Sequence, residues 1–518
     1  MNNQDLYQDI IPEGPKDPRV TAIYQLHCIT VMFFFIAFTY YIFVRLPLWG
    51  DEYFTYKVLQ MPFREGIRAI LNDVHPPLFW ILFYPAFAGV KDLIIIRSFT
   101  MLFGFLALFY AGSIAGAHER EDIHAKDTML VSFSLIAFTS PFIFLFMPML
   151  RYYSLFALLT AYSLLLKYIL KGKWLSIIEI IIVDTLLLYT SFIGGLILVG
   201  SNIYLLSRKK LQFSKVQHIL IWVLPWLFFS PIIGYFTRAI TKLSTQDIFK
   251  ADFGAGLKGF IVRILYSLHV FISGEFVYPW QPSGIIMFAL AVYLIYRFIR
   301  YGPSELKSLI GWGILMPALL TIIGSVTLFS LGMEFLPPRI AFAQPFLLLA
   351  LAIGLKTIQS KKLYIALLIL FVLGNLHADY NLAVRKNFLH STYIIPWQRI
   401  LDEIDSKFKG GDVIVYDDEA FMYYLEKDSY AIRSANVSSI ELSNITVYNR
   451  IWVVFSPKDI TPNHKMQDFL DGLEKSGYTE VEHKYYLEEM ESARRIKEKL
   501  LGRPVSQYKK ELILFESP

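Results

Sequence analysis

Two adjacent carboxylates, Asp51 and Glu52, are the residues of this sequence whose position most suggests chemistry. They follow the uncharged run Tyr24 to Val44, which has the ~20-residue length that a helix needs to cross a bilayer. A base must lie within hydrogen-bond reach of the hydroxyl that it activates, and low-dielectric surroundings raise the basicity of a carboxylate. The pair is therefore a candidate acid/base site for sugar or lipid hydroxyls at a membrane surface. The alternative is that both residues cap and solvate a helix that begins near Tyr53.

His75 is a candidate ligand for an anion. It follows Asp73 and precedes Pro76-Pro77, and proline suits the first turn of a helix, whose positive end favours negative charge. Asp73 has its own explanation as a helix cap. The combination of His75 with Asp51 and Glu52 is what makes it a functional candidate.

Two arginines are expected on the outer side of the membrane, where the topology rule disfavours positive charge. Arg151, followed by Tyr152, lies between two apolar runs, and Arg339 lies just before another. An arginine retained in such a place is expected to pair with an acid or a phosphate. For Arg339, a salt bridge with Glu334 remains open as the structural alternative.

The composition is that of a polytopic membrane protein. Of 518 residues, 55% are hydrophobic and 18% are charged, so most apolar surface is expected to face lipid. The net charge of +6 comes from basic residues in short loops, which indicates topology and no nucleic-acid partner. The single cysteine, Cys28, excludes an internal disulfide. The first apolar run lacks a small-residue cleavage site and is expected to be a retained helix.

Basic turns order the elements that must position these residues, because such turns favour the cytoplasmic side. The turns are 120 to 126, 167 to 173, 208 to 215, 297 to 307 and 356 to 362. Anchoring them inside predicts about eleven spans. These are 24 to 44, 98 to 117, 128 to 147, 150 to 170, 174 to 189, 191 to 206, 217 to 236, 283 to 300, 306 to 328, 342 to 357 and 362 to 378. Their odd number places the C-terminal end outside.

Three other segments complete the membrane part. Residues 76 to 96 are apolar, but a full crossing there would reverse every later loop, so a juxtamembrane or re-entrant segment on the outer side is expected. Residues 62 to 72 have the period of an interfacial amphipathic helix. Residues 237 to 281 are expected to form a long outer loop that could cover a site like a lid. Glu179 and Asp184, inside a predicted span, are expected to be structural.

The composition changes after Ala378, which predicts two domains, 1 to 378 in the membrane and 379 to 518 outside it. The second contains strand-like runs at 412 to 416, 451 to 455 and 511 to 515, with a helical pattern at 466 to 475. This is typical of a soluble α/β domain. It has no dinucleotide-binding fingerprint and no P-loop.

Four motifs together resemble a known family, the protein O-mannosyltransferase and aminoarabinose transferase superfamily (glycosyltransferase family 39, GT-C fold). The similarity covers about residues 20 to 378. The motifs are Leu48-Trp49-Gly50-Asp51-Glu52, Asp73-Val74-His75-Pro76-Pro77-Leu78, Met149-Leu150-Arg151-Tyr152-Tyr153-Ser154-Leu155 and Pro338-Arg339-Ile340. Two positions depart from the family pattern: Ile340 stands where relatives often have tyrosine, and Ser191 where many have histidine.

The resemblance implies a polyprenyl-phosphate sugar donor and transfer to a hydroxyl acceptor of a glycan, lipid or protein, with inversion at the anomeric carbon. It implies a multi-pass protein of the plasma (inner) membrane that serves the cell envelope as a hexosyl- or pentosyltransferase. In this scheme Asp51 deprotonates or orients the acceptor and Glu52 helps to position it. Arg151 and Arg339 stabilise the departing phosphate, and His75 binds the phosphate or orients a carboxylate. Tyr152 is expected to be a substrate-binding residue beside Arg151.

Two alternatives remain open at the level of sequence. A lipid or glycan transporter or flippase would show repeated halves and ionisable residues near mid-membrane, whereas here the polar residues lie on one face. No cofactor is indicated with certainty. Asp51, Glu52 and His75 are also of the types that bind a divalent cation, so metal dependence stays open.

Overall fold

The computed structural model describes residues 36–42, 46–73, 75–118, 123–169, 173–208, 214–232, 234, 237, 256–327, 337–385, 395–427, 434–445, 447–456, 464–486, 491–501 and 510–517. The chain divides into two compact units. The first comprises Met1–Val44 with Val58–Ala383, and the second comprises Arg45–Lys57 with Val384–Pro518. The short segment that carries the acidic pair therefore belongs to the C-terminal unit, which the sequence did not predict. Helix α3 (Gly50–Gln60) runs across the boundary.

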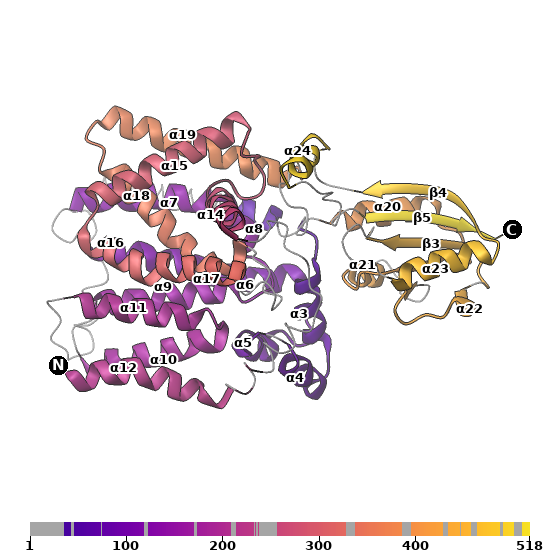
Figure 1. The fold of residues 1–518 in the computed structure, drawn as a ribbon, viewed down its shortest axis with the longest axis horizontal. Coiled ribbons are helices and arrows are strands. Elements are labelled where there is room, and N and C mark those ends of the chain that lie inside the picture. Colours follow the sequence, from indigo (N-terminus) through magenta and orange to yellow (C-terminus); the bar gives the residue numbers. More distant parts are fainter. Residues whose placement is uncertain are drawn as a thin grey trace. The chain divides into compact units, whose positions relative to one another are not determined.

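The first unit is built of helices (Figure 1). They include α4 (Phe63–Leu71), α5 (Leu78–Phe87), α6 (Leu93–His118), α7 (Ile123–Phe138), α8 (Pro141–Phe146), α9 (Tyr153–Ile169), α10 (Trp174–Thr190), α11 (Gly194–Ser207), α12 (Lys215–Phe229), η1 (Ser230–Ile232), α14 (Gly256–Ser273), α15 (Pro282–Tyr301), α16 (Ser304–Ile310), η2 (Gly311–Leu315), α17 (Met316–Thr327), η4 (Pro337–Ala343), α18 (Gln344–Lys356) and α19 (Lys361–Ala383).

Six helical stretches among the described residues are long and apolar enough to cross a membrane. They are Leu93–Ala117, Lys215–Ile232, Pro282–Tyr301, Ser304–Ser325, Pro337–Lys356 and Lys361–Ala383. Shorter apolar helices include Tyr153–Ile169 and Gly194–Ser207. The predicted class, a polytopic helical protein, is confirmed, while the number of eleven spans stays a prediction. Most of the first predicted span and Cys28 lie outside the described residues.

The structure differs from the predicted spans at two places. The span expected over 128 to 147 is broken, because α7 ends at Phe138 and α8 begins at Pro141. Proline has no N–H for the helix ladder and disfavours helical backbone in the residue before it. The outer loop expected over 237 to 281 contains α14, an 18-residue helix that packs with its neighbours in the bundle. Most of residues 237 to 255 lie outside the described part of the chain.

A buried ion pair joins three of the apolar helices. Lys167 Nζ lies 2.8 Å from Asp184 Oδ2, and both side chains are fully buried. Ser163 donates to the other carboxylate oxygen at 2.6 Å, and Lys167 donates to Ser201 at 2.6 Å. Each charge therefore has a charged and a neutral partner, which is the condition for burying an ion pair in an apolar bundle. The structural interpretation of Asp184 agrees with this geometry.

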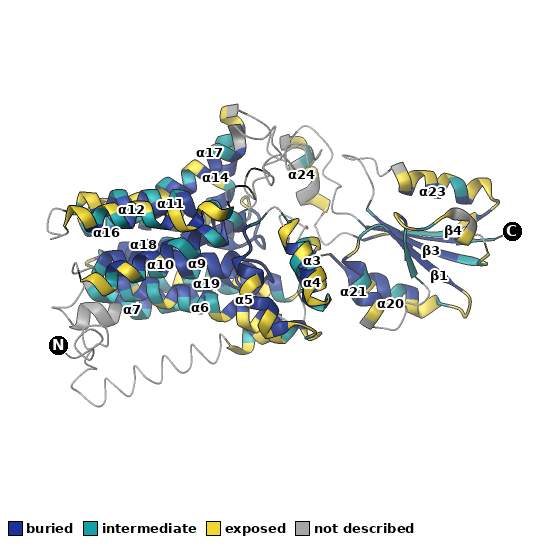
Figure 2. Cartoon of the chain, turned by 90° about the horizontal axis from the view of Figure 1, so that it is seen from below, coloured by how far each residue is buried: buried dark blue, intermediate teal, exposed yellow. Residues whose placement is uncertain are grey.

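The second unit is a five-stranded sheet with helices on both faces. The strand order is β2-β1-β3-β5-β4, with β1 (Val413–Tyr416), β2 (Ser434–Asn436), β3 (Arg450–Phe455), β4 (Thr479–Tyr486) and β5 (Lys510–Glu516). Strands β2, β1 and β3 are parallel, while β5 is antiparallel to β3 and to β4. Figure 2 shows α23 (His464–Lys475) over one face and α20 (Trp397–Lys407) and α21 (Phe421–Lys427) over the other.

Three strands of this sheet were predicted and two were missed. The buried runs of β1, β3 and β5 are apolar and easy to identify. Strand β2 has only three residues, and β4 reads Thr-Glu-Val-Glu-His-Lys-Tyr-Tyr, with four of its eight residues exposed at the sheet edge. Charged residues on an edge strand oppose pairing with other chains, and they also hide the strand from a hydrophobic pattern.

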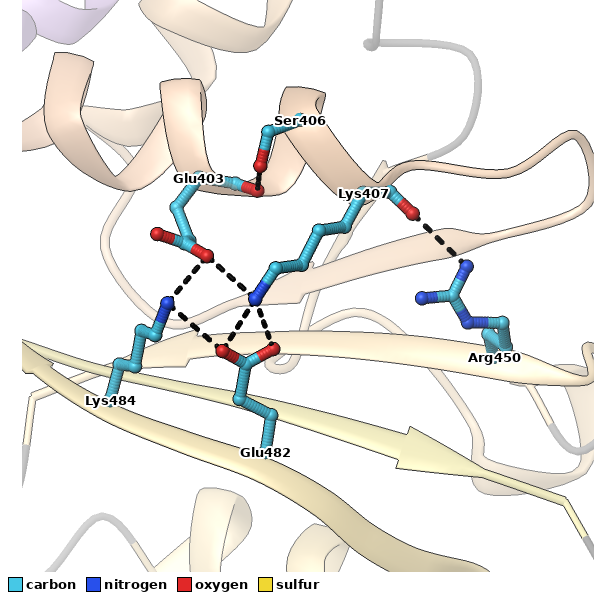
Figure 3. Close-up of polar contacts among 6 residues, drawn as sticks. All are labelled: Glu403, Ser406, Lys407, Arg450, Glu482 and Lys484. Carbon is cyan, nitrogen blue, oxygen red and sulfur yellow. Dashed lines mark hydrogen bonds and ion pairs between the residues drawn. The ribbon is translucent and has the colours of Figure 1, made fainter.

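An ion network connects α20 to the edge strand β4 (Figure 3). Lys407 Nζ lies 2.8 Å from Glu403 and 2.6 Å from Glu482, and Lys484 Nζ lies 2.6 Å and 2.9 Å from the same two carboxylates. Hydrogen bonds from Lys407 and Lys484 lower the pKa of Glu403 and of Glu482 below their ordinary values. The network specifies how the helix lies against β4, although partly exposed pairs add little stability.

Candidate active site

Arg151 lies in the short connection between α8 and α9 and is 3% exposed. This connection is held against α6 by a hydroxyl. Thr100 Oγ1 lies 2.7 Å from the carbonyl oxygen of Pro148 and 2.8 Å from that of Arg97 on its own helix. The chains also approach closely here, since a Cβ on Gly104 of α6 would lie 2.8 Å from Met147 Cβ. Helix α6 thus fixes the main chain that precedes Arg151.

His75 and Arg151 lie in contact. The sequence alone does not predict this contact. Arg151 Nη2 is 3.4 Å from both ring nitrogens of His75, so the guanidinium group faces the ring as a whole. His75 Nδ1 lies 3.1 Å from Asp73 Oδ2. The carboxylate can only accept here, so the neutral ring carries its proton on Nδ1 and donates a hydrogen bond from that N–H to Asp73. A carboxylate, an imidazole and a guanidinium group therefore form one polar chain.

Aromatic rings surround this polar chain. The ring centroid of Tyr152 lies 5.2 Å from that of His75, and the centroid of Trp80 lies 6.3 Å from it. Arg151 Cζ lies 5.9 Å from the centre of the Tyr152 ring, within the range of a cation–π contact. Arg151 is buried, and its attraction for an anion is stronger there than in water because a charge interaction is screened less.

Asp73 makes a contact that the sequence does not predict. It was explained as a helix cap, whereas in the structure its carboxylate contacts His75. The signal was present in the sequence as an aspartate two positions before a histidine, but only the folded loop shows that the side chains turn toward each other. Of the predicted residues, His75, Arg151 and Tyr152 are brought together.

Arg339 lies on η4 (Pro337–Ala343). It is half-buried, and no ion pair joins it to another residue in the described part of the chain. The element η4 packs against α9, with the rings of Phe342 and Phe156 5.3 Å apart. Glu334, its proposed salt-bridge partner, lies outside the described residues. The structure therefore leaves the role of Arg339 as a prediction.

Asp51 and Glu52 form the first turn of α3 in the second unit. Glu52 is 1% exposed and Asp51 is half-buried. Acidic residues in a first turn are favoured by the helix dipole, so the capping interpretation accounts for part of their placement. It does not by itself account for the deep burial of Glu52, because a carboxylate is rarely buried without a specific reason.

A metal site would need several ligands close together. Within the described ranges, no three histidine, cysteine, aspartate or glutamate side chains are grouped so that they could hold a metal ion.

The fold is similar to that of ArnT from Cupriavidus metallidurans. The apo structure of that protein matches with a TM-score of 0.51 at 12% sequence identity, over 94% of this chain and 97% of that chain. The chain therefore has an ArnT-like GT-C fold, mostly helical, with several candidate membrane spans and a small C-terminal sheet domain. At this identity the likeness concerns the fold alone.

Two further structures match more weakly. ArnT from Cupriavidus metallidurans bound to undecaprenyl phosphate gives a TM-score of 0.47 at 12% identity, over 94% of this chain and 97% of that chain. The Archaeoglobus fulgidus oligosaccharyltransferase in complex with zinc and sulfate gives 0.36 at 13% identity, over 84% of this chain and 68% of that chain. The fold assignment rests on the first match. No protein-family model matches the sequence, and a search of curated proteins found no match.

Proposed function

We propose that this chain is an inverting membrane glycosyltransferase that moves a sugar from a polyprenyl-phosphate donor to a hydroxyl acceptor at the outer face of the membrane. The observation that carries the proposal is the buried Arg151, which contacts His75 at the start of α9. A buried cation beside apolar helices suits an anionic ligand whose tail lies in lipid. The GT-C fold and the resemblance of four motifs to glycosyltransferase family 39 support the same function.

In the proposed reaction, Asp51 accepts the proton of the acceptor hydroxyl. The acceptor oxygen then attacks the anomeric carbon from the side opposite the phosphate, and the bond from that carbon to the phosphate oxygen breaks. The polyprenyl phosphate leaves with one more negative charge than the donor carried. Stabilising this growing charge is the largest single effect available to the protein.

Arg151 and Arg339 are proposed to bind the departing phosphate, with His75 and Tyr152 completing the binding site. A charge-assisted hydrogen bond contributes ~1.5 to 3 kcal/mol, and Arg151, which would donate it, is buried. Glu52 is proposed to orient the acceptor beside Asp51. The sheet domain is proposed to lie on the outer side, and the protein in the plasma (inner) membrane.

The first test identifies the donor and the base. Mass spectrometry of lipid that co-purifies with the protein should find a polyprenyl phosphate carrying a sugar. With that donor, Asp51→Asn should lower transfer by ~10² or more while the lipid still binds, because the substitution keeps size and hydrogen bonding but removes the proton acceptor. Glu52→Gln should have a smaller effect.

The matched control is Glu65→Gln, which neutralises an exposed carboxylate of α4 and should transfer at the rate of the unchanged protein. An Asp51→Asn protein that is present at normal levels and transfers at a near-normal rate would disprove the catalytic assignment. Movement of the lipid across vesicles without any transfer would indicate a flippase. Loss of activity with a chelator, restored by excess divalent cation, would indicate that a metal takes part.

A further inference from the structure

Leu48, just before the acidic pair, is held by side chains from the distant end of the sequence. Its N–H donates to the hydroxyl of Tyr424 at 2.8 Å, and its carbonyl oxygen accepts from the indole N–H of Trp397 at 3.2 Å. Leu48 itself is completely buried. Both of its backbone polar groups are thus satisfied by side chains of the second unit, which fixes the main chain at this point.

Two further contacts hold the segment on the other side of the acidic pair. The ring of Tyr56 meets that of Tyr423 edge to face, with centroids 5.2 Å apart. Lys57 Nζ lies 2.9 Å from Glu419 Oε2. Contacts before and after Asp51 therefore join residues 46–57 to the same unit.

These contacts lie near the carboxyl end of strand β1. Strand β1 ends at Tyr416, Glu419 follows in the next turn, and α21 begins at Phe421. Trp397, at the start of α20, stacks on Phe421 with centroids 5.1 Å apart. In open α/β sheets, ligands bind beyond the carboxyl ends of the parallel strands. Here residues 46–57 of the same chain contact Glu419, Tyr423 and Tyr424, which follow the carboxyl end of β1.

We infer that the C-terminal unit positions the acidic pair, with Tyr424 and Trp397 as positioning residues that clamp Leu48. The inference rests on the proposed function of Asp51 and gives the sheet domain a part in the reaction. A base that is displaced by about 1 Å can lose about a hundredfold in rate. The clamp keeps the start of α3 in one conformation, so that Asp51 meets the acceptor hydroxyl in a fixed geometry.

Two conservative variants test the clamp. Tyr424→Phe removes the acceptor for the Leu48 N–H, and Trp397→Phe removes the donor to its carbonyl oxygen. Each should lower kcat about tenfold, and the double variant more, while the KM for the donor stays unchanged, because donor binding is assigned to other residues.

The matched controls remove similar bonds elsewhere in the same unit. Tyr478→Phe deletes a buried tyrosine hydroxyl that donates to the Tyr448 carbonyl oxygen at 2.6 Å, and Trp452→Phe deletes an indole donor to Asp412 at 2.9 Å. Either control should lower the thermal stability of the unit about as much as its partner variant, and both should keep kcat within about twofold. A fall in kcat that merely follows stability across all four variants would overturn the positioning role.

A spectroscopic measurement tests the clamp without any activity. A Cβ at Gly50 meets nothing within 4 Å, so a nitroxide can be attached to Gly50→Cys once Cys28 is replaced. We expect a sharper, more mobile spectrum in Tyr424→Phe and Trp397→Phe, and no change in Tyr478→Phe. An unchanged spectrum in Tyr424→Phe, which removes a single oxygen atom, would disprove the clamp even where the double variant does not fold. If the unchanged protein transfers no sugar at all, the proposed function fails, while the spectrum still decides whether the clamp exists.

Discussion

Among single residues, the carboxylate of Asp73, the ring of His75 and the guanidinium group of Arg151 form the group of contacts that substitution can test most directly. Residue type and spacing singled out His75, Arg151 and Tyr152, and in the structure these three lie together. The contact between His75 and Asp73 was missed, because a loop can direct neighbouring side chains to either side. The local pattern predicts the type of a residue, while the direction of its side chain depends on the packing around it.

Asp73 is predicted to orient His75. Asp73→Asn keeps the shape of the side chain and an oxygen that can accept from His75, but it removes the charge. Because a hydrogen bond to a neutral group is weaker than one to a charged group by on the order of 1 kcal/mol, kcat/KM for the donor should fall about tenfold. His75→Gln should cost at least as much. Steady-state kinetics with the purified donor would measure both.

The control for this prediction is Asp92→Asn. The carboxylate of Asp92 accepts from the N–H of Ile94 at 2.8 Å on the surface of the same unit, and asparagine caps a helix about as well. Equal losses in Asp73→Asn and Asp92→Asn would mean that the effect is general and not a property of His75.

At the scale of elements, close approaches decide where the loops lie. Predicted and observed helices agree in kind for most of the membrane unit, because apolar runs of that length are visible in the sequence. The break at Ser140 was missed even though Pro141 follows it, since the length of the apolar run outweighed the proline. The contact between α6 and the connection before Arg151 depends on the absence of a side chain at Gly104, which no periodicity reveals.

Gly104→Ala is predicted to displace this connection. The new Cβ would lie 2.8 Å from Met147 Cβ and 3.0 Å from its Cγ, and overpacking of this kind costs ~1 to 3 kcal/mol. The midpoint of thermal unfolding and the affinity for the donor should both fall. Gly324→Ala is the control, because a Cβ on this helical glycine meets nothing within 4 Å. Normal donor affinity in Gly104→Ala would show that the position of Arg151 does not depend on this contact.

The tyrosines around α3 give the clamp a predicted pH dependence. Burial raises the pKa of Tyr56 and of Tyr416 to about 12, and burial with the nearby Glu426 and Glu419 raises the pKa of Tyr53 above its ordinary value. The folded state thus favours the protonated hydroxyls. Their contribution to stability is complete below pH ~10, the ordinary tyrosine pKa, and is lost as the pH rises through about 12.

The nitroxide at position 50 should therefore become mobile between pH ~10 and ~12, together with the absorbance change of ionising tyrosine. Tyr56→Phe should shift this onset upward, because it removes one of the groups that must ionise. Tyr485→Phe, which alters a tyrosine that is 55% exposed on β4, should leave the onset where it was. If the nitroxide becomes mobile at the same pH in the unchanged protein, in Tyr56→Phe and in Tyr485→Phe, then ionisation of Tyr56 does not cause the transition.

At the scale of the whole molecule, the class was predictable and the division into units was not. Composition predicted a helical membrane part followed by an α/β domain, and the fold confirms that class. The predicted boundary lay at Ala378, whereas α19 continues to Ala383 and buries Asp379. The inclusion of residues 45–57 in the C-terminal unit depends on contacts such as Leu48 with Tyr424, separated by 376 positions. Local patterns carry no information about contacts so distant in sequence.

The arrangement across the membrane is the last prediction, and one helix tests it. Helix α19 (Lys361–Ala383) is long and apolar enough to cross once, so a residue just before it and a residue of the second unit should lie on opposite sides. Ser360 and Glu474 are exposed positions of this kind. In a protein without Cys28, a cysteine at 474 should react with a membrane-impermeant thiol reagent in intact cells, and one at 360 should react only after lysis. The expected direction follows from Lys356, Lys361 and Lys362, which favour the cytoplasmic side.

A cysteine at Asp92, on the expected outer side of α6, is the third probe and should react as position 474 does. Labelling of 360 with protection of 474 and 92 would invert the topology, and it would place the acidic pair on the side of the membrane opposite to the proposed transfer.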